Sequence, residues 1–121
     1  MKIFFDGGCR PNPGRIEVAV VAGGVTYLEL DLGHGTSNDA EWLAALHALE
    51  VAASLGVQDV QLLGDSAFVV DQANRSGSGR ASAFAARFDA LRSQFTRVRI
   101  RRIGRAQNLA GIALSRRYSG R

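Results

Sequence analysis

A single long helical pattern separates three strand-like segments from a fourth, and this order constrains the fold more than any other feature of the chain. Apolar or partly alternating runs at 2–6, 16–22 and 25–32 predict strands. Pro11, Pro13 and Gly14 mark a tight connection after the first, and Gly23-Gly24 marks a hairpin after the second. Apolar side chains then recur at helical spacing over about 38–55. Because a helical crossover brings the chain back in parallel, the run 60–64 should lie parallel to the first strand.

The remainder of the chain adds three helical patterns and one strand pattern. We predict helices over 66–73, 82–94 and 108–118 and a fifth strand over 96–103. The order β-β-β-α-β-α-α-β-α predicts an α/β fold with a mixed five-stranded sheet, three antiparallel strands followed by two parallel ones, and helices on both faces. With 121 residues and no internal repeat, we expect residues 1–121 to form a single domain.

The charge is divided unevenly along the chain. Residues 1–71 hold 3 basic and 10 acidic side chains, a net charge of −7, and residues 72–121 hold 12 basic and 1 acidic, a net charge of +11. Nearly all of the basic residues are arginines, whose planar guanidinium suits phosphate. A basic half of this kind favours a nucleic-acid partner, although a solvated arginine-rich surface has the same composition.

Three of these arginines, Arg97, Arg99 and Arg101, alternate with apolar residues along the predicted fifth strand. They could form a track for backbone phosphates. They could equally be charges that protect an edge strand from pairing with another molecule. The sequence leaves both interpretations open.

Several classes of protein are disfavoured by composition. No apolar stretch approaches the roughly 20 residues that cross a bilayer, so we expect no membrane association. Cys9 is the only cysteine, which excludes an intrachain disulfide and favours a cytoplasmic location. We expect the protein to be a monomer.

Three acidic residues occupy positions from which carboxylates can meet. Asp6 ends the first predicted strand, Asp65 ends the fourth, and Glu41 lies in the first turns of the long helix, whose N-cap we predict at Ser37 or Asn38. Asp6 and Asp65 should emerge a few ångströms apart if their strands are parallel neighbours. Carboxylates that close repel unless a cation neutralises them, and oxygen ligands suit Mg²⁺. The sequence therefore predicts a metal site.

Four short motifs, in this order and over nearly the whole chain, resemble the ribonuclease H family. They are Asp6-Gly7-Gly8-Cys9 with Asn12-Pro13-Gly14, Thr36-Ser37-Asn38 with Glu41, Gly64-Asp65-Ser66, and the block from Ile100 to Asn108. The resemblance is to type 1 ribonuclease H in its short form. The basic protrusion of some members is replaced here by a short loop over 74–80.

The resemblance implies a metal-dependent endonuclease that hydrolyses the RNA strand of RNA/DNA hybrids with two Mg²⁺ ions, for which Mn²⁺ can substitute. It implies that Asp6, Glu41 and Asp65 are the catalytic, metal-binding carboxylates. The residues that it places at the substrate are Gly7, Cys9, Asn12, Ser37, Asn38, Ser66 and Arg105.

The chain departs from the family pattern at three positions. The family has a fourth carboxylate four residues after the asparagine that Asn108 matches, where this chain has Ile112, and no acidic residue follows Asp89. Ala67 replaces a glutamine common after the Asp-Ser pair, and arginines replace a histidine before the final helix. We therefore expect slow cleavage. A non-catalytic nucleic-acid-binding module of the same fold, or a protein-interaction domain, remains an alternative.

Overall fold

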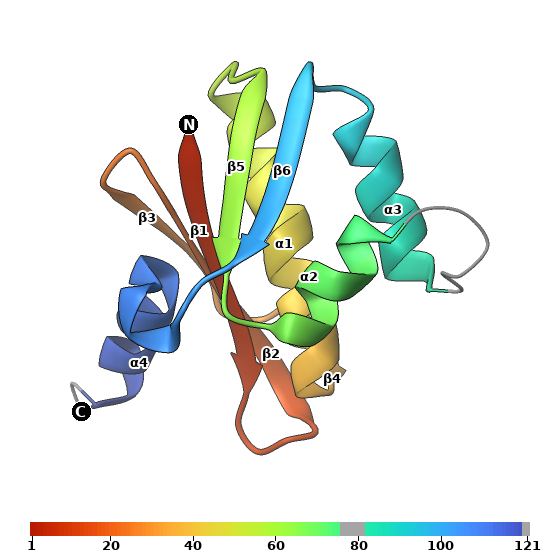
Figure 1. Cartoon of the computed structure of the whole chain (residues 1–121). Helices are drawn as coiled ribbons and strands as arrows, with labels where there is room; N and C mark the ends of the chain where they lie inside the picture. Colours follow the sequence, from red (N-terminus) through yellow and green to blue (C-terminus); the bar gives the residue numbers. More distant parts are fainter. Residues whose placement is uncertain (76–81, 120–121) are drawn as a thin grey trace.

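The computed structural model describes residues 1–75 and 82–119, so most of the predicted loop over 74–80 lies outside the described residues (Figure 1). The elements are β1 (Lys2–Cys9), β2 (Gly14–Ala22), β3 (Val25–Glu29), β4 (His34–Gly35), α1 (Ser37–Ser54), β5 (Asp59–Gly64), α2 (Ala67–Asn74), α3 (Ala83–Arg92), β6 (Arg97–Arg102), the 3₁₀ turn η2 (Arg105–Gln107) and α4 (Leu109–Ser119). None of the helices in these ranges is long and apolar enough to cross a membrane.

The main sheet has the predicted mixed topology, with the strand order β3-β2-β1-β5-β6. β2 is antiparallel to both β1 and β3, whereas β5 is parallel to both β1 and β6. Gly23 and Gly24, at the predicted hairpin between β2 and β3, both adopt the positive φ that such a tight turn requires. The two-residue strand β4, which pairs with β2, was not predicted.

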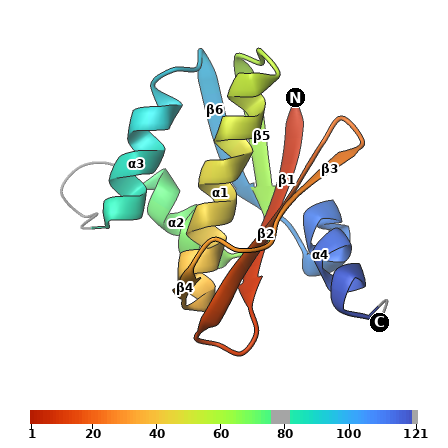
Figure 2. The same cartoon turned by 180° about the vertical axis from the view of Figure 1, so that it is seen from behind.

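Helices cover both faces of the sheet, as predicted. Helices α1, α2 and α3 lie on one face, and α4 packs on the other against β1 and β2 (Figures 1 and 2). β2 is accordingly buried on both sides, with Val18 and Val20 in the larger core and Ala19 and Val21 in the smaller core under α4. Trp42 anchors the larger core, stacked on Phe84 and edge-on to Phe88.

The end predicted for β1 was wrong in a way that affects the site. β1 does not end at Asp6 but runs on to Cys9, because β2 continues to pair with it; Asp6 therefore lies within the strand, opposite Ala19. The parallel pairing of β1 with β5 stops at Phe4, so β5 does not pair with β1 at Asp6. β3 also ends at Glu29, shorter than the predicted 25–32.

The N-cap of α1 is Thr36, not Ser37 or Asn38 as predicted. The Thr36 hydroxyl accepts a hydrogen bond from the Asp39 N–H at 3.2 Å, and the Asp39 carboxylate accepts one from the Thr36 N–H at 2.9 Å. This reciprocal capping box fixes the first turn of α1. Ser37 and Asn38 are thereby placed in that first turn, one and two residues after the cap.

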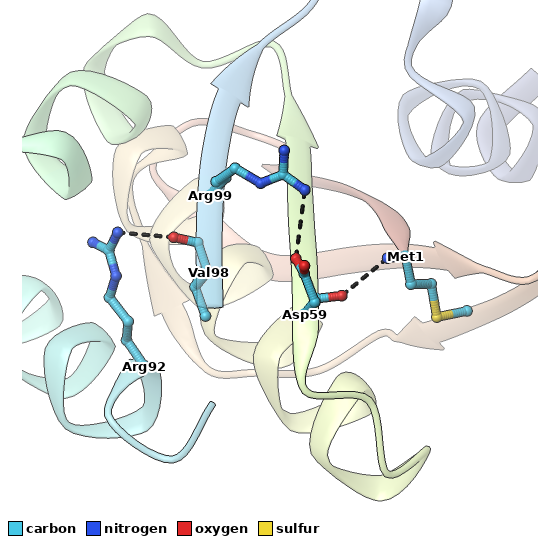
Figure 3. A network of polar contacts seen from close by, with 5 residues as sticks. All are labelled: Met1, Asp59, Arg92, Val98 and Arg99. Atoms are coloured by element: carbon cyan, nitrogen blue, oxygen red, sulfur yellow. Dashed lines mark hydrogen bonds and ion pairs between the residues drawn. The ribbon is translucent and has the colours of Figure 1, made fainter. Parts of the chain in front are cut away.

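Two backbone carbonyl groups of the edge strand β6 accept side-chain hydrogen bonds. The Val98 oxygen accepts one from the Arg92 guanidinium at 2.9 Å (Figure 3). The Ile100 oxygen accepts one from the Asn74 amide at 3.2 Å. Arg99 forms an ion pair with Asp59 at 3.4 Å. These contacts favour edge protection for this part of β6 and remove Arg99 from the predicted phosphate track.

Candidate active site

Close packing between α1 and β1 places Glu41 beside Asp6. A Cβ atom at Gly7 would collide with the backbone carbonyl of Ala40, so only glycine lets the helix approach this strand. The Gly7 N–H then donates a hydrogen bond to Glu41 Oε1 at 2.7 Å. The glycine that follows Asp6 therefore both admits the helix and orients its carboxylate.

Asp65 is held by a residue whose role the sequence did not indicate. Asn108, which is fully buried, donates from its Nδ2 to Asp65 Oδ2 at 3.1 Å and to the Phe5 carbonyl oxygen at 3.0 Å. Its Oδ1 accepts a hydrogen bond from the Ala110 N–H at 3.1 Å. One side chain thus ties β1, the end of β5 and the start of α4 together. The sequence marked Asn108 only as the end of the fourth family motif and the start of a predicted helix, not as a partner of Asp65.

The three predicted carboxylates converge. One oxygen each of Asp6, Glu41 and Asp65 lies within 4.8 Å of the other two. Burial, with a further contribution from the neighbouring carboxylates, raises the pKa of Glu41 to about 8 and the pKa of Asp6 to about 7. The Gly7 N–H opposes this rise in the pKa of Glu41, and Arg105 opposes it in the pKa of Asp6.

This arrangement fits a hard divalent cation. All three donors are carboxylate oxygens, the ligands that Mg²⁺ and Mn²⁺ prefer. Burial first, and the neighbouring carboxylates second, raise the pKa values of Asp6 and Glu41 and so disfavour the ionised cluster; a bound cation would offset both effects. The predicted metal site is therefore chemically consistent with the residues that the structure brings together.

A cavity of about 380 Å³ opens over the carboxylates, and it includes nearly every residue assigned to the site. Besides Asp6, Glu41 and Asp65, its lining contains the predicted substrate residues Gly7, Cys9, Ser37, Asn38, Ser66 and Arg105. Asn12 does not line the cavity. Its Oδ1 instead accepts a hydrogen bond from the Ser37 N–H at 3.2 Å and lies 3.6 Å from Cys9 Sγ. Asn12 thus positions two lining residues rather than facing the cavity itself.

The first turn of α4 presents Gly111, not Ile112, to this cavity. A Cβ atom at Gly111 would lie 3.6 Å from Asp6 Oδ2, whereas Ile112 follows it in the helix and is not part of the lining. α4 therefore contributes Gly111, Leu114 and Ser115 to the lining but no charged group. The absence of a fourth carboxylate, inferred from the sequence, holds for the lining of this cavity.

A buried ion pair fixes α4 against the sheet. Glu17 in β2 is 3% exposed, and its Oε2 accepts hydrogen bonds from Arg117 Nη2 at 2.6 Å and from Arg117 Nε at 3.0 Å. The two residues are 100 positions apart, so no local pattern could indicate the pairing. Together with Asn108, this contact determines where α4 lies relative to the carboxylates.

The raised pKa values predict a stability that depends on pH and on metal. A carboxyl group whose pKa is higher in the folded protein stabilises the fold below its unfolded pKa, and this contribution is lost as the pH rises through the folded pKa. In EDTA, we expect the Tm to fall by several degrees between about pH 5 and pH 8 as Asp6 and Glu41 ionise. Mg²⁺ should restore the Tm most strongly at high pH. Calorimetry across this range tests this, and Asp6→Asn should flatten the decline.

Removal of the Asn108 side chain should destabilise the fold. Asn108→Ala leaves the buried Phe5 carbonyl and the Asp65 carboxylate without this donor, so we expect the free energy of unfolding in urea to fall by about 2–4 kcal/mol. Asn38→Ala, at an exposed asparagine of the same cavity, is the matched control and should change it by less than about 0.5 kcal/mol. Equal effects of the two substitutions would contradict the assigned role of Asn108.

Comparison with known proteins identifies the family of this chain. The family model described as "Reverse transcriptase-like" matches residues 5–118. Ribonuclease HI of Halobacterium salinarum is 42% identical over 74 residues, a segment that covers 57% of this chain and 37% of that relative. The sequence match thus spans little more than a third of that protein's length.

Solved structures extend the similarity to the whole fold. RNase H1 from Halobacterium salinarum has a TM-score of 0.80 at 28% identity, covering 99% of this chain and 98% of that one. An N-terminal RNase H domain from Mycobacterium tuberculosis, solved as a fusion with maltose-binding protein, has a TM-score of 0.73 at 29% identity, covering 93% of each chain. On the combined evidence of family model, relative and fold, this chain belongs to the type 1 ribonuclease H family.

Proposed function

We propose that this protein is a metal-dependent endonuclease that hydrolyses the RNA strand of RNA/DNA hybrids. The observation that carries the proposal is the convergence of three partly buried carboxylates, from β1, α1 and the end of β5, on one cavity in a ribonuclease H fold. Membership of the family supports a nuclease, and the geometry supports a site that can hold a metal ion.

Three residues of this site would bind the metal ion, and two others hold the metal ligands in position. Asp6, Glu41 and Asp65 would hold Mg²⁺ or Mn²⁺, which when bound activates water and stabilises charge on a phosphate. The Gly7 N–H keeps Glu41 directed into the cavity, and Asn108 does the same for Asp65. These contacts keep the ligands in place before a cation or substrate arrives, which lowers the entropy lost on binding.

The walls of the cavity suit a sugar-phosphate backbone. Ser37 and Asn38 at the start of α1, Ser66 at the start of α2 and Arg105 in η2 supply hydroxyl, amide and guanidinium groups around the carboxylates. Hydroxyl and amide groups can bind the 2′-hydroxyls that distinguish RNA from DNA. A further structure with this fold, LC11-RNase H1 at 23% identity and a TM-score of 0.74, was solved in complex with an RNA/DNA hybrid. That complex supports a hybrid as the substrate to test first.

One observation favours a second candidate, a hybrid-binding module without efficient cleavage. The cavity lacks a charged group from α4, where Gly111, Leu114 and Ser115 line it. Three carboxylates can hold one cation, but a second cation would have fewer protein ligands. We expect this difference to slow the reaction rather than prevent it, because Mg²⁺ retains several of its waters in protein sites.

Incubation of the pure protein with a labelled RNA/DNA hybrid, first in Mg²⁺ and then in Mn²⁺, distinguishes these functions. Cleavage of the RNA strand that is lost in Asp6→Asn supports the nuclease. Binding without cleavage in either metal supports the module instead, and DNA or RNA duplexes serve as substrate controls. Light scattering on the same sample tests whether the protein is a monomer, as predicted. The cytoplasmic location stays a prediction from the cysteine content.

A further inference from the structure

A second cavity adjoins the carboxylate cluster. It measures about 610 Å³ and lies where β6 passes into η2, with walls that include Arg101, Arg102, Gly104, Arg105 and Gln107. Asp65 is the one acidic residue in its lining. Asp65 and Arg105 line both cavities, so the two are neighbours with a common wall.

The arginines of this second cavity are available to an anion. Arg101 and Arg105 are exposed, and within residues 1–75 and 82–119 the Arg101 side chain has no hydrogen-bond or ion-pair partner. Arg102 donates from Nε to the Asp65 carbonyl oxygen at 3.4 Å, which engages one of its five N–H groups. Arg99, two residues before Arg101, differs because it is paired with Asp59.

The backbone that carries Arg105 is fixed in advance. The Gly104 N–H donates to Gln107 Oε1 at 3.2 Å, and the Gln107 N–H donates to the Gly104 carbonyl oxygen at 3.0 Å. The Ile103 N–H donates to the Gly64 carbonyl oxygen at 2.9 Å, which ties this segment to β5 immediately before Asp65. A turn held in this way loses little conformational entropy when a ligand binds.

We propose that Arg101, Arg102 and Arg105 form an anion subsite that binds a backbone phosphate of the nucleic acid, adjacent to the phosphate at the carboxylates. The inference rests on the proposed function and deepens it, because it says where the nucleic-acid strand lies beyond the phosphate at the carboxylates. Guanidinium groups bind phosphate through paired N–H donors, and the cavity is of the size that accepts a nucleotide. Because the cavities share Asp65 and Arg105, neighbouring phosphates of one strand can occupy both.

Titration of ¹⁵N-labelled protein with inorganic phosphate, in EDTA, tests the subsite without any substrate. The Nε–Hε NMR signals of Arg101, Arg102 and Arg105 should shift together with one saturating curve. Arg97 provides an internal control, because it is exposed at the opposite end of the same strand and lines neither cavity. Its signal should stay in place.

The salt dependence of hybrid binding tests whether a backbone phosphate of the nucleic acid binds at this subsite. It is measured in EDTA so that no cleavage occurs. Arg101→Gln should weaken binding roughly tenfold at low salt and reduce the slope of log K against log salt by about one unit. Arg97→Gln is the matched control and should leave the slope unchanged. Both residues are exposed on β6, so neither substitution should alter the fold.

The outcomes separate the subsite from the proposed function. Phosphate-induced shifts in a protein that does not bind hybrid would keep the subsite and reject the hybrid as substrate. Normal hybrid cleavage, with an unchanged slope in Arg101→Gln and no phosphate-induced shifts, would reject the subsite and keep the nuclease. An equal loss of slope in Arg97→Gln would show a general basic surface and would also overturn the subsite.

Discussion

Asp65→Asn is expected to abolish metal-dependent cleavage, a loss of several orders of magnitude, while leaving the fold and the affinity for hybrid intact. Asparagine keeps an oxygen that can accept the hydrogen bond from Asn108, so the side chain should remain in place. The substitution removes one of three anionic ligands and one source of the raised pKa values of Asp6 and Glu41. The Tm in EDTA should therefore be unchanged or higher, and hybrid binding unchanged or tighter, because a charge that repels phosphate is gone.

Asp59→Asn is the control for this experiment. Asp59 begins the same strand, β5, is exposed and pairs with Arg99 (Figure 3). It lines neither cavity. The Asp59→Asn variant should cleave hybrid at the same rate as the unsubstituted protein. Fluorescence anisotropy for binding and a gel-based rate for cleavage give the two readouts. If Asp65→Asn cleaved within about tenfold of the unsubstituted protein, Asp65 could not be an essential metal ligand.

The order of the elements and the sheet topology could be predicted because each depends on local patterns and general rules of connection. The apolar residues of 16–22 and the stripe that includes Trp42 are visible in short windows of sequence. The parallel pairing of β1 with β5 follows from the crossover helix between them. These rules also place Asp6, Glu41 and Asp65 near one another, which is why the three carboxylates could be named in advance.

Other features could not be predicted because they depend on contacts between distant residues. Asn108 contacts Phe5 across 103 positions, and Arg117 contacts Glu17 across 100, so neither partner can be identified from local sequence. The end of β1 was placed too early because the residues after Asp6 lack an apolar pattern, yet pairing with β2 keeps them extended. The cap of α1 was misplaced by one or two residues because three adjacent polar residues, Thr36, Ser37 and Asn38, are all acceptable caps, and the Thr36–Asp39 contact selects the first.

Ile112→Asp is expected to increase the rate of cleavage by about two orders of magnitude or more. The family resemblance puts a carboxylate at this position. Ile112 itself does not line the cavity, because successive helix residues point about 100° apart and Gly111 is the one that faces Asp6. The gain therefore requires the aspartate side chain to turn back toward the carboxylates. An aspartate here would give a second cation an additional anionic ligand, and it lies near the start of α4, where the helix dipole favours negative charge. Isothermal titration with Mn²⁺ should show tighter binding, and Ile112→Asn, which adds no charge, should give a much smaller gain.

Gly111→Asp tests whether the gain depends on the position of the carboxylate rather than on negative charge alone. A Cβ atom at Gly111 would already be in van der Waals contact with the Asp6 carboxyl group, at 3.6 Å from both Cγ and Oδ2. A carboxylate built from there would crowd Asp6 and repel it, which leaves little space for a cation between them. We therefore expect Gly111→Asp to lower the Tm and the rate, and the two neighbouring substitutions to act in opposite directions. A gain at Gly111 with none at Ile112 would move the fourth ligand to the residue that lines the cavity. No gain at either, with the fold preserved, would mean that three carboxylates are the full complement this protein uses.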